Sequence, residues 1–163
     1  MAVAEIIGAA IGVMLLVVVA YMLVGSVLTT AEVVTTAQKD LTLQNEMRIR
    51  TDFSISEKYS TSTNFTYKIS NNGTEIISDF KHVDVLVRDS NGDYYLYPWD
   101  DTRGTEGIEG TWQIFDRYPD VVHPYELDPG ETFTIRVNIR ADKGTPEWFQ
   151  MTTGNGVYAS AYL

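Results

Sequence analysis

One stretch near the N-terminus constrains this chain more than any other part of its sequence. From Ile6 to Leu28 no residue carries a charge, and Val, Leu, Ile, Met, Ala and Gly fill nearly every position. As a helix, this run of roughly 23 residues would be about 35 Å long, and the hydrocarbon core of a bilayer is about 30 Å thick. The sequence therefore predicts one membrane-spanning helix.

Three kinds of segment share this composition: a cleaved signal peptide, a plain membrane anchor, and a helix that packs against copies of itself. A signal peptide has a basic region before a shorter apolar core, whereas no Lys or Arg precedes Lys39. Close packing of membrane helices needs small residues, and the spacing Gly8-x-x-x-Gly12 supplies them. The sequence argues against the signal peptide and leaves the other two open.

Glu5 directly precedes the apolar run. An acidic side chain at this depth is costly unless it is paired or reaches the membrane interface. The carboxylate either extends into the headgroups or pairs with the free α-amino group of a neighbouring chain. Energetics alone favour the first interpretation.

The helical pattern continues beyond the apolar run. No Gly or Pro occurs from Thr29 to Glu46, so we expect the helix to continue to about residue 45. This gives a transmembrane or assembly helix at 1–45 and a second domain at 46–163. From Met47 to Ile55 apolar and polar residues alternate, which predicts a strand that follows the helix directly.

The second domain reads as a series of short strands separated by turns. Further strands are expected at 65–69, 83–88, 94–97, 111–115, 132–139, 148–151 and 157–162. Asn91-Gly92 predicts a type I′ hairpin, Gly154-Asn155-Gly156 a second hairpin, and Asp128-Pro129-Gly130 a turn before a long strand. The expected fold class is α+β: a long hydrophobic helix followed by an antiparallel immunoglobulin-like β-sandwich.

Composition excludes several classes of function. The net charge of −10 argues against a nucleic-acid partner. The chain has no Cys, and its two His residues, His82 and His123, lie in different elements, so we predict no metal site. The sequence has no G-x-S-x-G elbow, no Walker loop and no G-x-G-x-x-G motif, so we predict no cofactor and no catalytic residues. Asp89 to Asp93 resembles the start of a calcium loop, but Tyr94 stands where an EF-hand needs Gly. We interpret it as a hairpin turn.

Other signals concern the surface. Asp100 to Gly110 is acidic and Gly-rich, and we expect a solvated surface loop in preference to a weak Ca²⁺ site built from Asp100, Asp101, Glu106 and Glu109. Asn64 and Asn72 each begin an Asn-x-Thr sequon, so both are candidate glycosylation sites that favour an exterior domain. Lys39, the first basic residue, lies after the apolar run. By the positive-inside rule it weakly favours a cytoplasmic location for the second domain.

Several of these features together resemble a known family. They are Glu5 before the apolar run, the string Phe80 to Asp89, the turn Leu127-Asp-Pro-Gly-Glu131 and the ending Asn155 to Leu163. The chain resembles archaeal type IV pilin-like proteins, and most of all the FlaF/FlaG-type accessory proteins of the archaeal flagellum (the archaellum). The basic leader of pilin-like precursors is absent from the sequence.

The resemblance implies a non-catalytic component of the motility machinery. Its N-terminal helices would form a homo-oligomer in the membrane, and its β-sandwich would lie outside the membrane. There it would contact other stator proteins and the surface layer (S-layer), holding the rotating filament to the envelope. The resemblance also implies that Glu5 pairs with a neighbour's terminal amine, provided that Met1 is the mature N-terminus.

Two alternatives stay open. The first is a filament-forming archaellin or adhesion pilin, which would share the same helix. The second is a membrane-tethered module that binds carbohydrate through exposed aromatic side chains, for which the candidates are Trp99, Trp112, Trp148, Tyr94, Tyr95 and Tyr97.

Overall fold

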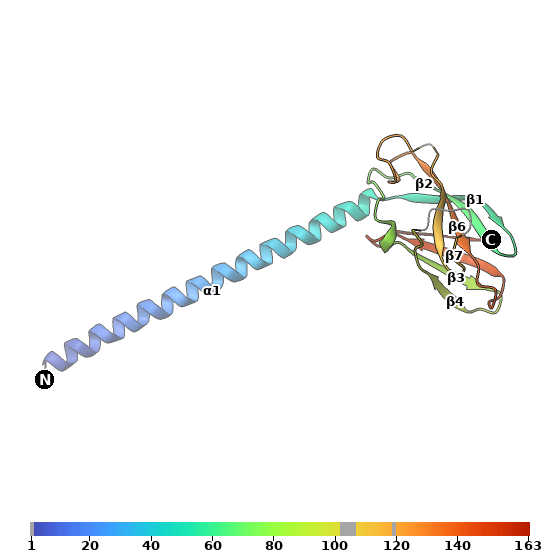
Figure 1. Cartoon of the computed structure of the whole chain (residues 1–163). Coiled ribbons are helices and arrows are strands. Elements are labelled where there is room, and N and C mark those ends of the chain that lie inside the picture. Colours follow the sequence, from blue (N-terminus) through green and yellow to red (C-terminus); the bar gives the residue numbers. More distant parts are fainter. Residues whose placement is uncertain (1, 102–106, 119) are drawn as a thin grey trace. The chain divides into compact units, whose positions relative to one another are not determined.

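The computed structural model describes residues 2–101, 107–118 and 120–163. The chain divides into two compact units, residues 1–44 and residues 45–163. Helix α1 spans Ala2–Arg50 and is followed by two antiparallel four-stranded sheets, so the predicted fold class is confirmed (Figure 1).

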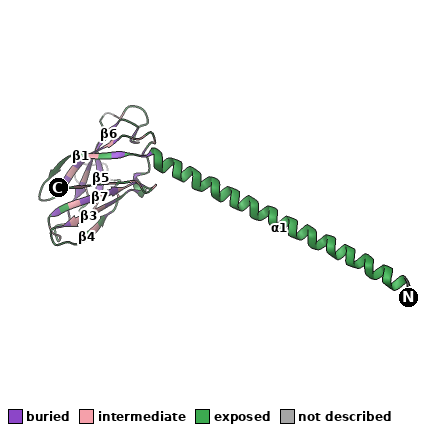
Figure 2. Cartoon of the chain, turned by 180° about the vertical axis from the view of Figure 1, so that it is seen from behind, coloured by how far each residue is buried: buried purple, intermediate pink, exposed green. Residues whose placement is uncertain are grey.

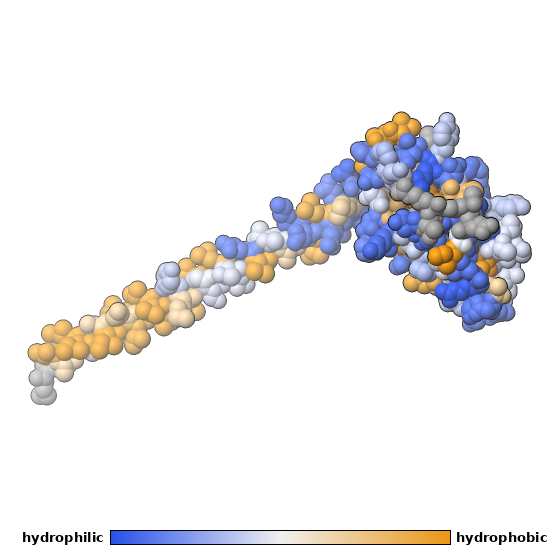
Figure 3. Space-filling model, in the orientation of Figure 1, coloured by the Kyte–Doolittle hydropathy of each residue, from blue (hydrophilic) through white to orange (hydrophobic). Residues whose placement is uncertain are grey.

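Helix α1 is the one helix of the described residues that is long and apolar enough to cross a membrane. Its described side chains are exposed (Figure 2), and Figure 3 shows the hydrophobic surface of its first half giving way to polar residues farther along. Five Thr residues lie in the second half. Their hydroxyls donate to the carbonyl four residues earlier, as Thr29 does to Gly25 at 3.0 Å and Thr35 to Ala31 at 2.8 Å. These bonds let a Thr-rich segment stay helical.

The helix ends later than the sequence predicted, at Arg50 instead of about residue 45. The predicted strand from Met47 is therefore wrong in its first half, because Met47 to Arg50 form the last helical turn. The Thr51 N–H still bonds to the Met47 carbonyl at 3.0 Å. A short alternating run fits either period, and here the basic residues Arg48 and Arg50 suit the negative end of the helix dipole.

Eight strands occur in the described residues of the second unit. They are β1 (Phe53–Ser60), β2 (Asn64–Asn71), β3 (Asp84–Asp89), β4 (Tyr94–Tyr97), β5 (Trp112–Asp116), β6 (Thr132–Asn138), β7 (Pro146–Thr152) and β8 (Tyr158–Tyr162). One sheet has the order β1-β2-β6-β5 and the other β4-β3-β7-β8. A short 3₁₀ helix, Phe80–His82, lies between β2 and β3.

The core is built from the inward residues of both sheets (Figure 2). Phe65, Tyr67 and Phe149 are fully buried, and the rings of Tyr67 and Phe149 lie 4.4 Å apart between centroids. Burial raises the pKa of the Tyr67 hydroxyl far above its usual value, and this hydroxyl lies 3.6 Å from the sulfur of Met151. The period of two that predicted the strands thus also identified the core.

The free edges of the two sheets meet on both sides of the core. On one side, Trp99, just after β4, forms a parallel bridge with Trp112 of β5. The Trp112 N–H donates to the Pro98 carbonyl at 3.0 Å. On the other side β1 lies against β8, and the Lys58 ammonium contacts the Tyr162 carbonyl.

Two hairpins join neighbouring strands through loops of the same kind. The hairpin at Asn91-Gly92 is present, but the predicted type I′ turn is wrong, because Gly92 has a positive φ of 87° and Asn91 does not. The Gly92 N–H donates to the Asp89 carbonyl at 3.0 Å, as in a three-residue loop that ends in a left-handed Gly. A loop of the same kind joins β7 to β8 and ends in Gly156, which has a φ of 80°. This second hairpin lies where the sequence predicted it.

Candidate functional site

The predicted assembly residues lie on the first turns of α1. Glu5, Gly8 and Gly12 are all exposed, and a Cβ added at Gly8 or Gly12 would meet no atom within 4 Å. The helix surface is thus open for a second helix to approach closely at these positions.

The last turn of α1 belongs to the second unit and is hydrogen-bonded to the turn that follows β2. The N–H groups of Thr74 and Glu75 donate to the Arg50 carbonyl at 2.9 and 3.2 Å, and the Gly73 N–H donates to the Asp52 carbonyl at 2.9 Å. A Cβ at Gly73 would lie 2.4 Å from the Arg50 oxygen, so only Gly fits. These bonds satisfy a carbonyl that a helix end otherwise leaves unpaired.

The former calcium candidate is a structural turn, as the sequence analysis favoured. The Asp89 side chain is buried and accepts hydrogen bonds from the N–H groups of Asn91, Asp93 and Gly144 at 2.9, 3.0 and 3.0 Å. Burial acts to raise the pKa of Asp89, but these bonds hold it below its usual value. Within the described ranges, no three acidic or His side chains are placed to hold a metal ion.

The two His residues lie in separate places, each beside an Asp. His82 Nδ1 is 2.6 Å from the Asp79 carboxylate on an exposed surface. His123 Nδ1 is 2.8 Å from the buried carboxylate of Asp128. Among the described residues, no Ser or Thr hydroxyl forms a hydrogen bond with either His ring, so neither His–Asp pair is part of a catalytic triad there.

The acidic segment 100–110 is only partly as expected. Glu106 lies outside the described residues. Asp101 is exposed, but the expectation of a fully solvated loop is wrong for Asp100, which is buried. Its carboxylate accepts the Ile108 N–H at 3.2 Å, and the Glu109 carboxylate accepts the Ala141 N–H at 2.6 Å. These acids therefore hold backbone groups of the fold.

The candidate sugar-binding aromatics divide between the core and the surface. Trp112 and Tyr97 are buried, and Trp99 packs against Trp112 with ring centroids 4.6 Å apart, so these belong to the core. Tyr94 and Trp148 lie on the outer face of the β4-β3-β7-β8 sheet, in edge-to-face contact with centroids 6.3 Å apart. Sequence reasoning missed the exposed residues that share this face, although their alternation along the strands marks them. They are Leu96, Tyr158 and Tyr162.

The two sequons lie at different kinds of position. Asn64 begins β2 and is half-buried, and its amide donates to the Thr63 hydroxyl at 3.3 Å. Asn72 is exposed in the turn after β2, where its amide donates to the Ser54 hydroxyl at 3.0 Å. Glycosylation at either residue stays a prediction.

The comparisons with known proteins give a match in structure alone. No protein-family model matches the sequence, and no curated protein matches it. The solved structures that match include stator proteins of the archaellum.

The first is the archaellum periplasmic stator protein FlaG from Sulfolobus acidocaldarius. It matches with a TM-score of 0.51 and 17% identity, over 69% of this chain and 99% of that one. A structure of the FlaF and FlaG stator complex from the same organism matches with a TM-score of 0.49 and 18% identity, over 68% of this chain and 87% of that one. The resemblance found in the sequence is thus confirmed at the level of the fold.

Proposed function

We propose that this protein is a membrane-anchored, non-catalytic component of an archaeal motility machinery. In this role α1 anchors the chain in the membrane and assembles with other copies. The β-sandwich lies outside the membrane and connects the motor to envelope proteins, including other stator proteins and the surface layer. The observation that carries the proposal is a FlaG-like sandwich fold on a chain whose helix has the length and composition to cross a membrane.

The location of the β-sandwich can be tested directly, because the chain has no native Cys. A single Cys is introduced by Ser90→Cys at the exposed tip of the β3–β4 hairpin. We expect a membrane-impermeant maleimide to label this variant on intact cells of the native host. Labelling that requires cell lysis would contradict an exterior domain.

The role in motility is tested by deleting the gene in the same host. Loss of an anchoring component should leave filaments that assemble but do not drive normal swimming, as seen by electron microscopy and motility assays. Loss of a filament subunit should leave no filament, and purified protein should then form continuous fibres. Normal swimming after deletion would exclude both roles.

The assembly role of α1 rests on Glu5. Glu5→Ala should abolish association of the full-length chains in native gels while leaving the β-sandwich folded by circular dichroism. Glu32→Ala, a change of the same charge on the same helix beyond the apolar run, is the matched control. Equal association of both variants and the wild type would exclude pairing through Glu5.

The outer face that carries Tyr94 and Trp148 supports a second candidate, a sugar-binding module. Exposed aromatic rings stack on the apolar faces of sugars, and the nearby Arg88–Glu147 ion pair, 3.4 Å apart, offers groups that hydrogen-bond hydroxyls. Glycan-array binding by the full chain in detergent that is lost in Trp148→Ala would favour this function over anchoring through proteins.

A further inference from the structure

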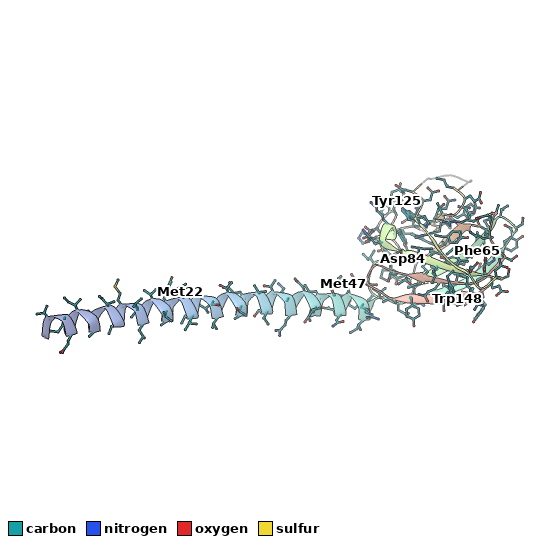
Figure 4. All side chains as sticks on the ribbon, turned by 90° about the horizontal axis from the view of Figure 1, so that it is seen from below. Met22, Met47, Phe65, Asp84, Tyr125 and Trp148 are labelled. Atoms are coloured by element: carbon teal, nitrogen blue, oxygen red, sulfur yellow. The ribbon has the colours of Figure 1, made fainter. Side chains whose placement is uncertain are left out.

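The loop between β5 and β6 presents apolar side chains to solvent. In the 120–126 loop, Val121 is 74% exposed, Val122 63% and Tyr125 53%. Figure 3 shows hydrophobic residues gathered at the upper edge of the domain, where this loop lies in Figure 1. Figure 4 places Tyr125 and Trp148 at opposite edges of the domain in its view, so this surface is distinct from the aromatic sheet face.

Acidic side chains hold the backbone of this loop in place. The Val121 N–H donates to Glu131 Oε1 at 3.0 Å, and the His123 N–H donates to Asp128 Oδ2 at 2.9 Å. Both carboxylates are buried, with 8% of Glu131 and 3% of Asp128 exposed. The Tyr125 N–H donates to the Asp120 carboxylate at 3.0 Å. Three N–H groups of a surface loop are thus fixed by side chains.

The loop also stores backbone strain. Tyr125 has a φ of 75°, in the left-handed region that side chains other than Gly disfavour. Strained residues persist where the surroundings enforce them, and they concentrate at binding sites. The side chains of Val121 and Val122 are exposed and add nothing to the core. Ordering the loop in advance does lower the entropy lost when a partner binds.

Charge indicates what kind of partner fits this surface. No Lys or Arg occurs between Arg117 and Arg136, whereas four acids lie in that interval: Asp120 and Glu126 are half-buried, and Asp128 and Glu131 are buried beneath the loop. The four acids outnumber Arg117, the one basic side chain in contact with the described loop, whose guanidinium lies 5.6 Å from the centroid of the Tyr125 ring. An acidic surface is repelled by an anionic membrane and attracted by a basic protein surface.

We propose that the 120–126 loop is a preformed protein-binding site that inserts Val121 and Val122 into an apolar pocket rimmed by Lys or Arg on an envelope protein. This inference rests on the proposed function and names the surface through which the β-sandwich acts. An apolar centre within a polar rim is the usual anatomy of such a contact.

The test uses the full-length chain in its native host. Benzoylphenylalanine replaces Val121 in one strain and Leu96 in another; Leu96 is a similarly exposed apolar residue (54%) on the β4-β3-β7-β8 sheet. After irradiation, the peptides joined to this chain are identified by mass spectrometry. We expect at least five times more adduct at position 121 than at 96, with one protein whose crosslinked surface is apolar and flanked by Lys or Arg.

A pair of serine variants provides a second measurement. Val121→Ser/Val122→Ser should lower recovery of that protein with the purified chain at least tenfold. Tyr59→Ser/Ile108→Ser, at two exposed apolar residues outside both the loop and the aromatic sheet face, should leave recovery unchanged. Adducts mainly with lipid or with a second copy of this chain, or equal adducts at positions 121 and 96, would overturn the inference.

The outcomes separate this inference from the proposed function. If gene deletion stops swimming while the Val121→Ser/Val122→Ser variant swims normally and the crosslinker at position 121 forms no adduct with an envelope protein, the loop inference fails and the motility role stands. If position 121 crosslinks to an envelope protein of the stated chemistry but deletion leaves swimming intact, the loop is a binding site and the motility role fails.

Discussion

The 89–93 turn and the 120–126 loop are fixed in the same way but present opposite kinds of side chain. In each, buried carboxylates accept backbone N–H groups: Asp89 in the turn, and Asp128 and Glu131 in the loop. The turn presents exposed Ser90 and Asn91, whereas the loop presents Val121 and Val122. The fold gains a hairpin from the first, and the second orders apolar groups that the core does not use. The same hydrogen-bonding device thus serves stability in one place and, by our proposal, binding in the other.

The largest effect is expected from Asp89→Ala. This change removes the carboxylate that accepts three backbone N–H groups. Two of them, Asn91 and Asp93, lie in the turn itself, and the third, Gly144, lies in the loop before β7. Buried donors left unpaired are costly. We expect the midpoint of thermal unfolding of the β-sandwich to fall by about 5–10 °C, measured by calorimetry on the full chain in detergent. Asp93→Ala, whose exposed carboxylate accepts from the Tyr95 hydroxyl at 3.1 Å, is the matched control. Equal midpoints for the two variants would contradict the structural role of Asp89.

Asp128→Asn should affect only the 120–126 loop, whereas Asp89→Ala should lower the stability of the whole β-sandwich. It weakens the contacts with the N–H and ring of His123 but leaves the Val121 bond to Glu131. We expect amide exchange of His123 to rise at least tenfold, with exchange of β6 amides unchanged, as measured by hydrogen-exchange mass spectrometry. Uniform acceleration across β6 would show that the loop is part of the folding unit and is not separately ordered.

The two regions should also differ in their response to pH. The hydrogen bond to Asp128 and its charge raise the pKa of His123, with Glu126 and Glu131 adding to the effect. The same hydrogen bond lowers the pKa of Asp128. The contribution of protonated His123 is complete below about pH 6.5 and is lost as pH rises through the raised pKa. The contribution of Asp128 is present above about pH 4 and is lost as pH falls through its lowered pKa.

Protection of the 120–126 loop should therefore be greatest between about pH 4 and 6.5 and decline above that window. The 89–93 turn contains no His, and Asp89 also has a lowered pKa, so its protection should stay constant there. An NMR titration of the His123 ring together with pH-dependent amide exchange measures both. A His123 pKa at or below that of an unstructured peptide would contradict the pairing.

The smallest effects concern the two left-handed residues. Gly92 has a φ of 87°, and a Cβ added there would meet no atom within 4 Å. We therefore expect Gly92→Ala to lower the unfolding free energy by about 1 kcal/mol, from backbone strain alone. Tyr125→Gly relieves the same kind of strain but loses the contact with Arg117, whose guanidinium lies 5.6 Å from the ring centroid. We expect its unfolding free energy to stay within about 0.5 kcal/mol of wild type, because the relieved strain offsets the lost contact and the added chain entropy. Denaturant titration distinguishes the two, and a loss in Tyr125→Gly as large as in Gly92→Ala would show that Tyr125 stabilises the fold.

Regular patterns made most of the fold predictable from the sequence. The apolar run predicted the helix, and alternation placed the strands at Phe65 to Ile69 and at 132–139 close to their observed bounds. The boundary between helix and first strand was placed too early, near Met47, because a short alternating run is compatible with both a helix and a strand. The hydrogen bonds that fix the boundary come from the turn at Gly73, which is distant in the sequence. The pairing of β2 with β6, far apart in the chain, likewise depends on tertiary packing.

The proposed site was less accessible to sequence reasoning. Asp128 and Glu131 were identified only as part of a turn, since burial of their carboxylates depends on how β6 packs. A signal was nevertheless present: Val121-Val122 has no alternating partners and is followed by three acids, Glu126, Asp128 and Glu131, with no Lys or Arg before Arg136. Such a pair fits neither a strand nor a solvated loop. The aromatic residues show the converse, because Trp112 and Trp148 look alike in sequence and only the fold separates core from surface.

The edges of the two sheets are protected against β-pairing with other copies of the chain. Unpaired edge strands are templates for intermolecular β-pairing, and a domain anchored by an associating helix would be held at high local concentration beside its copies. Here the bridge between Trp99 and Trp112 covers one side, and the other carries a bulge in β1, the left-handed Glu57 and the charged Lys58. Neighbouring domains held close together could then stay separate without fusing into a continuous sheet.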